Sequence, residues 1–142
     1  MVQLFLIARI AGRTVAINSD QVESVVDIPE VTPVPGATAA VRGLAALRSR
    51  VVTVIDTCVA LGLTSAGRGA GRAVITKVDG HHYAVTVDHL EDVAPFDHAA
   101  LSDGVAIDGG WARAACGIVL RDGDPILAID LRALIPGLAL AA

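Results

Sequence analysis

Three aspartates that follow similar apolar segments are the first candidates for chemistry. The segments are V-V-T-V-I-D at 51–56, Y-A-V-T-V-D at 83–88 and P-I-L-A-I-D at 125–130. Carboxylates that converge in a fold can act as general acid and base. An aspartate at a strand end can instead cap the next turn, and the short apolar stretches after Asp56 and Asp130 favour that interpretation. We expect Asp56, Asp88 and Asp130 to be structural, with a small hydrolytic or ligand-binding barrel as the alternative.

The histidines do not follow a known metal-binding pattern. His81 and His82 are adjacent, so along a strand they would point to opposite sides. His89 and His98 have neither the i, i+4 spacing nor the glutamate of a zinc protease helix. Because a zinc site needs three or four converging ligands, we predict no metal, and we expect His81 and His82 to be exposed beside a turn.

The glycines and cysteines also favour structural interpretations. Gly67, Gly69 and Gly71 resemble a phosphate-binding loop only in their glycine content, because no Lys-Ser or Lys-Thr and no helix follow them. Cys58 and Cys116 form no C-x-x-C pair, so we expect both to be reduced and buried. The sequence therefore predicts a glycine-rich linker, no disulfide and no cofactor.

Three arginines are the candidates for binding. Arg42, Arg48 and Arg50 follow a proline-rich segment, and Arg48-Ser49-Arg50 is a polar break between two apolar runs. An arginine on a rigid β element is a common anchor of protein interfaces. An arginine on an edge strand also keeps that strand from unwanted pairing, and the sequence alone leaves both roles open. Since no catalytic constellation stands out, a binding module is the better inference than an enzyme.

Composition sets the class of protein that must position these residues. The chain has 142 residues, of which 54% are hydrophobic and 18% charged, as expected for one folded domain spanning 1–142. Its apolar runs are far shorter than the roughly 18 residues of a membrane helix, and its first residues do not suit a signal peptide, so we expect a cytoplasmic protein. A net charge of -4 and four aromatic residues disfavour nucleic acid as a partner.

Short Val- and Ile-rich runs between Gly, Asp and Pro predict an all-β fold. In the first half we expect a hairpin, a helical turn capped by Ser19-Asp20, an extended segment, a proline strap, a short helix, and a second hairpin with Arg48 at its tip or edge. These lie at 4–18, 19–23, 25–28, 29–36, 37–40 and 41–56.

The second half repeats this pattern after a linker at 64–72. We expect a hairpin around Asp79-Gly80, a strand at 90–93, a polar stretch at 97–110, and then two further strands with a terminal helical turn, at 114–120, 126–129 and 131–135. The recurring segments suggest duplication of a β unit of about 60 to 70 residues. We therefore place two subdomains at approximately 1–66 and 72–142, an arrangement that also allows their terminal strands to be exchanged.

Several segments in order resemble one known family. They are V-E-S-V-V-D-I-P-E-V-T-P-V-P-G, V-R-G-L-A-A-L-R-S-R-V-V-T-V-I-D and L-G-L, followed by A-V-T-V-D-H-L-E-D-V and G-I-V-L-R-D-G-D-P-I-L-A-I-D-L-R-A-L-I. Together they resemble the CheW-like domain of bacterial chemotaxis coupling proteins, also found as the regulatory domain of the histidine kinase CheA. The resemblance covers nearly the whole chain.

The resemblance implies two small five-stranded SH3-like β-barrels packed around a shared hydrophobic core. It also implies a scaffold without catalytic activity, which links the cytoplasmic tip of chemoreceptors to a CheA-type kinase at the inner face of the membrane. Arg48 and Gly43 fall on the family's arginine and preceding glycine, and Val22 falls on a position associated with receptor binding. With Arg42 and Arg50 these residues are the predicted partner-binding set.

The chain departs from the family pattern at several positions. Ala46 and Ser49 replace the Asn and Gly of Asn-Leu-Arg-Gly, Thr53 replaces a common proline, Thr57-Cys58 replaces Leu-Arg, and Ser24 replaces a frequent glutamate. The predicted function is a non-enzymatic adaptor that couples receptors to the kinase, and self-association through an edge strand is a further expectation. A CheW-like regulator with another signalling partner is the alternative.

Overall fold

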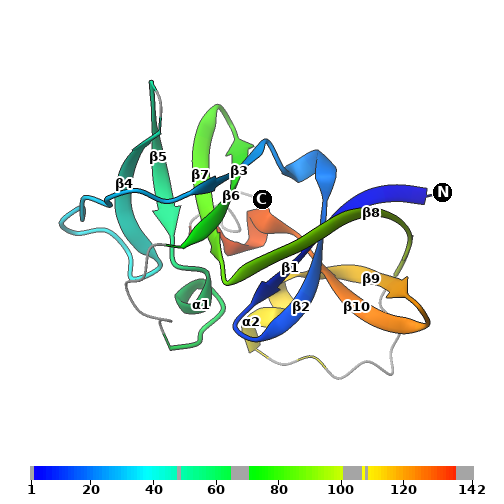
Figure 1. Ribbon diagram of the computed structural model, residues 1–142. Coiled ribbons are helices and arrows are strands. Elements are labelled where there is room, and N and C mark those ends of the chain that lie inside the picture. Colours follow the sequence, from blue (N-terminus) through cyan, green and yellow to red (C-terminus); the bar gives the residue numbers. More distant parts are fainter. Residues whose placement is uncertain (1, 48, 65–70, 101–106, 108, 137–142) are drawn as a thin grey trace.

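The structure is a computed structural model that describes residues 2–47, 49–64, 71–100, 107 and 109–136. The described chain is built mainly of strands, as the alternating apolar pattern predicts, in two five-stranded sheets that lie side by side (Figure 1). The predicted all-β architecture with short helical turns is therefore confirmed. No helix in the described ranges is long and apolar enough to cross a membrane.

Barrel A is the closed barrel on the right of Figure 1, with strand order β1-β2-β10-β9-β8. Its strands come from both parts of the chain: β1 (Val2–Ile10), β2 (Arg13–Asn18), β8 (His89–Ala99), β9 (Ala115–Arg121) and β10 (Asp124–Ile129). The predicted first hairpin is present, and Ala11 and Gly12 at its turn both have positive φ, as a two-residue hairpin requires. Pairing of β8 with β9 at His98 and Ala99 closes the barrel.

Sheet B has the strand order β3-β6-β7-β5-β4. Its strands are β3 (Ser24–Asp27), β4 (Val41–Leu47), β5 (Arg50–Ile55), β6 (Arg72–Val78) and β7 (His81–Val87). β5 and β7 run parallel, the other pairings described in this sheet are antiparallel, and the Asp79-Gly80 turn joins β6 to β7 as predicted. Among the described residues β3 and β4 do not pair with each other, so both are edge strands, and β4 has one isolated bridge, from Leu44 to Thr32.

The two sheets share one topology. Barrel A, read from β8, has the strand order β8-β1-β2-β10-β9, and sheet B, read from β3, has the order β3-β6-β7-β5-β4. The strands at the same place in the two orders are equivalent. In both sheets a short helix follows the matching strand: α1 (Thr57–Ala60) follows β5, and the 3-10 helix η2 (Leu131–Leu134) follows β10. The sheets nevertheless do not divide at the linker. Sheet B occupies 24–87, whereas barrel A combines 2–18 with 89–129.

Strand alternation produces three apolar clusters. In β1, Phe5 and Ile7 point into barrel A, whereas Leu6, Ala8 and Ile10 point to the other side and pack against strands of sheet B. The shared cluster between the sheets contains residues of both: Leu6, Ala8, Ile10, Val15, Ile17, Val74, Val85, Val87, Leu127, Ile129, Leu131 and Leu134 among others. A third cluster, around Val52, Val54 and Ile75, fills sheet B.

Three local predictions are wrong. The expected short helix at 37–40 is absent, because this segment is a turn whose Ala40 carbonyl accepts the backbone N–H of Asp56 at 2.7 Å. The cap of the 3-10 helix η1 (Ser19–Gln21) is Asn18, whose side chain accepts the N–H of Asp20, and not Ser19 or Asp20. Cys116 is exposed, whereas Cys58 is buried as expected.

The proline strap connects the two edges of sheet B. From the end of β3 it runs across the sheet to β4, and its Thr32 forms an isolated bridge with Leu44 (Figure 1). The remaining helix, α2 (Gly109–Ala114), follows β8 and precedes β9. The strap therefore holds the β4–β5 hairpin in place relative to β3.

Candidate functional site

A groove opens at the unpaired edge of sheet B, and we call it the edge groove. It has a volume of about 430 Å³. Its place in sheet B, between β3 and the β4–β5 hairpin, is equivalent to the place in barrel A where β8 and β9 pair. Its walls combine β3 with the end of the β4–β5 hairpin and two buried apolar side chains: Glu23, Ser24, Val25, Val26, Leu47, Ser49, Arg50, Val52 and Ile75. The short β3 thus leaves a partly apolar surface open in sheet B, whereas the pairing of β8 with β9 closes the equivalent place in barrel A.

An ionic cluster stands at the rim of the edge groove. Arg50 Nη1 lies 2.8 Å from Glu23 Oε1 and 2.9 Å from His82 Nε2, and His82 Nε2 lies 3.2 Å from Glu23 Oε2. The Arg50 and Glu23 side chains are 51% and 38% exposed, whereas His82 is only 14% exposed. Arg50 at the start of β5 is therefore held at this rim by Glu23, which precedes β3, and by His82 of β7.

The charges of this cluster affect the acidity of Glu23. Partial desolvation raises the pKa of its carboxyl, but the hydrogen bond from Arg50 and the charges of His82 and Arg50 outweigh that effect. The pKa of Glu23 is therefore lowered from its ordinary value of 4.5. Glu23 stays ionised near neutral pH and keeps its bond with Arg50.

A second cavity, the junction groove, continues from the edge groove through Glu23. It has a volume of about 470 Å³ and is lined by η1, the end of β6 and η2: Asp20, Gln21, Val22, Glu23, Thr76, Lys77, Val78 and Arg132. Val22 is half-buried here and packs against the shared core. The predicted site residues Val22 and Arg50 thus line two adjoining cavities.

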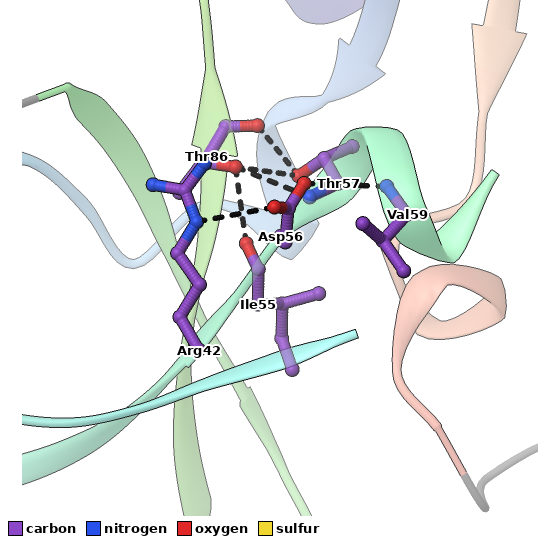
Figure 2. A network of polar contacts seen from close by, with 6 residues as sticks. All are labelled: Arg42, Ile55, Asp56, Thr57, Val59 and Thr86. Atoms are coloured by element: carbon purple, nitrogen blue, oxygen red, sulfur yellow. Dashed lines mark hydrogen bonds and ion pairs between the residues drawn. The ribbon is translucent and has the colours of Figure 1, made fainter. Parts of the chain in front are cut away.

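Arg42 lies in a different environment, on the side of β4 that faces α1 (Figure 2). Its Nε is 3.3 Å from Oδ2 of Asp56, whose side chain is 6% exposed. Asp56 Oδ1 also accepts the N–H of Val59, so the same carboxylate caps α1. Arg42 therefore supports the junction between β5 and α1 and does not line the edge groove.

Two threonines complete this junction (Figure 2). The Thr57 hydroxyl donates to the Thr86 carbonyl at 2.6 Å, and the Thr57 N–H donates to Thr86 Oγ1 at 3.2 Å. Thr86 Oγ1 in turn lies 3.0 Å from the Ile55 carbonyl. Thr57, which departs from the family pattern, thus ties β5 to β7 at the point where β5 ends.

Gly43 has a backbone requirement. Its φ is +147°, and a Cβ placed on it would overlap the carbonyl oxygen of Thr32 in the strap. The strap reaches β4 through two backbone hydrogen bonds, Thr32 N to Leu44 O at 2.8 Å and Leu44 N to Thr32 O at 2.9 Å. Gly43 therefore allows the strap to pack on β4.

Arg48, the glycine-rich linker and the three aspartates are the predicted features that remain. Arg48 lies outside the described residues, as does most of the glycine-rich linker. Asp56 and Asp130 cap α1 and η2 as expected, and Asp88 accepts the N–H of Gly12 at 3.3 Å. The described residues contain no group of three or more His, Cys, Asp or Glu arranged to hold a metal ion.

Glu23 was not among the predicted site residues, and the prediction that His82 is exposed is wrong. Glu23 carries no motif of its own, and Arg50 and His82 reach it only through the order of strands in sheet B. His82 was expected to be exposed, but it points towards Glu23 and is largely covered. The alternation of His81 and His82 along one strand was the available signal, since one of them had to face inward.

Comparison with known proteins gives a family and a fold. The family model of the CheW-like domain matches residues 4–138. The crystal structure of the scaffolding protein TtCheW from Thermoanaerobacter tengcongensis is similar, with a TM-score of 0.81 and 23% sequence identity over 96% of this chain and 94% of that one. No curated protein matches the chain.

Proposed function

The chain belongs to the CheW-like domain family, and on this premise we propose that it is a non-enzymatic adaptor that couples chemoreceptors to a CheA-type histidine kinase. In this role the protein works in the cytoplasm, next to the receptor arrays, and needs no cofactor. The family match supports the adaptor class. The two adjoining grooves offer a surface for one partner, and the β4–β5 hairpin offers a surface for the other.

The observation that carries this proposal is the unpaired edge of sheet B. Two sheets of the same topology differ at this place: β8 and β9 pair in barrel A, whereas β3 and β4 leave the edge groove open. Val25 is exposed beside Arg50, so an apolar contact and a charged anchor occur together, as in many interface centres. We propose that the receptor hairpin binds along the edge and junction grooves, against Val22, Val25 and Arg50.

The β4–β5 hairpin supplies the second proposed surface. Leu44 and Val51 are exposed on it, and in the sequence Arg48 falls between the last residue of β4 and the first residue of β5. Exposed apolar side chains on such a hairpin suit packing against the side chains of a similar β structure. We propose that the kinase regulatory domain, which shares this fold class by family, binds at this hairpin edge.

Titration calorimetry with two separate ligands tests the proposal: a chemotaxis kinase regulatory domain and a receptor cytoplasmic fragment. Binding of both supports the coupling role. Arg50→Ala should then weaken receptor binding by about 1 to 3 kcal/mol, and Arg48→Ala should weaken kinase binding by a similar amount, as at interface hot spots. Arg50→Ala should not alter the melting temperature strongly, since an exposed ion pair such as that of Arg50 with Glu23 contributes about 1 kcal/mol or less.

Arg121→Ala is the matched control. Arg121 forms an exposed pair with Glu91 at 3.3 Å on barrel A, away from both proposed surfaces. Its removal should leave both affinities unchanged. Binding of the kinase alone would favour a CheW-like regulator instead of a coupling protein, and binding of neither ligand would contradict the proposal.

A further inference from the structure

The rim cluster of Arg50, Glu23 and His82 contains one atom with two competing neighbours. His82 Nε2 lies 2.9 Å from Arg50 Nη1 and 3.2 Å from Glu23 Oε2. A guanidinium can only donate and a carboxylate can only accept. His82 Nε2 therefore satisfies Arg50 only when it carries no proton, and it satisfies Glu23 only when it does.

The protonation state of His82 thus selects between two arrangements of the rim. With a bare Nε2, Arg50 donates to both His82 and Glu23, and the cluster has a net charge of zero. When His82 is fully protonated, it donates to Glu23, loses its bond with Arg50 and repels the guanidinium. The net charge of the cluster is then +1, and half of the Glu23 carboxylate is engaged by His82.

We propose that His82 is a positioning residue that controls how strongly Arg50 is available to a partner in the edge groove. A neutral His82 with its proton on Nδ1 accepts a hydrogen bond from Arg50 and holds it on the wall of the groove. A protonated His82 gives up this bond, so that Arg50, still paired with Glu23 Oε1, can donate to an acidic side chain of the bound protein. The inference rests on the proposed function for its partner, but the internal competition for His82 is a property of the chain itself.

The charged groups around His82 are consistent with a rim that becomes more positive when His82 is protonated. On β6, Lys77 is its cross-strand neighbour, so a second positive charge faces the same side of sheet B. From β5 and the residue before β3, Arg50 and Glu23 face it, and its neighbours on β7 are His81 and Tyr83. Among these described groups Glu23 is the single acid, so protonation of His82 moves the rim further towards positive charge.

Histidine titrates in the range where this change can be measured. At low salt, one added charge about 4 Å from a partner carboxylate in water-like surroundings corresponds to about a fivefold change in affinity. We expect the receptor fragment to bind the wild-type chain about fivefold more tightly at pH 5.5 than at pH 8. His82→Gln should abolish this pH dependence, because a glutamine oxygen accepts from Arg50 at every pH.

His81→Gln is the matched control, since it removes the neighbouring histidine on the opposite side of the same strand. This variant should keep the pH dependence of the wild type. The inference is overturned if His82→Gln keeps the dependence, if His81→Gln loses it, or if binding weakens as the pH falls.

A measurement without a partner separates this inference from the proposed function. In NMR spectra of the chain alone, the Arg50 side-chain Nε–Hε signal should shift with the same midpoint as the His82 ring. The shift should be absent in His82→Gln and present in His81→Gln. The inference is overturned if the Arg50 signal does not shift as the His82 ring is protonated. If the receptor fragment binds at no pH, the proposed function is contradicted, and the NMR result alone decides the inference about His82.

Discussion

Gly43→Ala is the substitution whose effect follows most directly from the structure. The added Cβ would overlap the Thr32 carbonyl oxygen, and alanine tolerates the φ of +147° poorly. The conformational strain costs about 1 to 3 kcal/mol. Displacement of the strap would also remove the two hydrogen bonds between Thr32 and Leu44, at about 1 kcal/mol each. We expect the free energy of unfolding in urea to fall by about 3 to 5 kcal/mol.

Gly36→Ala is a control that separates the backbone strain of a positive φ from the steric overlap of the added Cβ with the strap. Gly36 lies in the same strap and also has a positive φ, +79°, but a Cβ there meets nothing within 4 Å. This control should lose only about 1 kcal/mol. A Gly43→Ala variant as stable as Gly36→Ala would refute the packing argument. If Gly43→Ala loses partner binding while its stability is unchanged, Gly43 instead contacts the partner directly.

Four further predictions concern Asp56, Thr86, Glu23 and Cys116. Asp56→Ala should lower the unfolding free energy by about 2 to 3 kcal/mol through loss of the α1 cap and the Arg42 pair, measured by urea denaturation against Asp124→Ala, an exposed residue at the start of β10. Thr86→Val should cost about 2 kcal/mol, and a double-mutant cycle with Thr57→Val should show strong non-additivity. Because the pKa of Glu23 is lowered in the folded chain, its carboxylate stabilises the fold above about pH 4.5, and this contribution disappears as the pH falls through the lowered value. The melting temperature of Glu23→Gln should therefore lie below that of the wild type at pH 7 and approach it in acid. Cys116 should be alkylated in the native protein, whereas Cys58 should be protected by burial. At pH 8 the alkylation of Cys116 should be slower than that of a free thiol, because burial and the charge of Asp130 raise the pKa of Cys116.

The strands were predictable because their residues alternate or form short β-branched runs between clear turns. The hairpin at Ala11-Gly12 and the one at Asp79-Gly80 show the strength of this signal. The segment 37–40 shows its limit. Its alanines favour a helix locally, but the strap fixes its path and the Ala40 carbonyl bonds to Asp56, so tertiary contacts override the propensity.

The repeated segments could be recognised in the sequence, but which segment of one sheet is equivalent to which segment of the other could not. The segment that ends in Asp56 does match the one that ends in Asp130, since β5 and β10 occupy equivalent places. The counterpart of the segment ending in Asp88 is T-V-A-I-N at 14–18, in β2. Asn18 replaces the aspartate there, which concealed the fourth copy and the cap that it provides.

The candidate site could be predicted only in part. Arg50 was recognisable by its place in a polar break, and Val22 and Gly43 by their resemblance to family positions. Glu23 and His82 depend on β3, β5 and β7 being brought together by a sheet whose order differs from the order of the sequence. Such a cluster has no fixed spacing along the chain, so no local pattern reveals it.

The shared topology of the two sheets has a consequence for how the molecule forms during synthesis. Sheet B uses one continuous stretch, 24–87, whereas barrel A needs β2 to pair in parallel with β10, which is made last. A growing chain can thus complete sheet B while the β1–β2 hairpin waits for its neighbours, with Leu6 and Ile10 already able to pack on Val74 and Val85. Relative to sheet B, barrel A is a circular permutation whose break corresponds to the 61–71 connection. Opening the chain at that connection and linking its present ends would exchange the two roles, so that barrel A would form first.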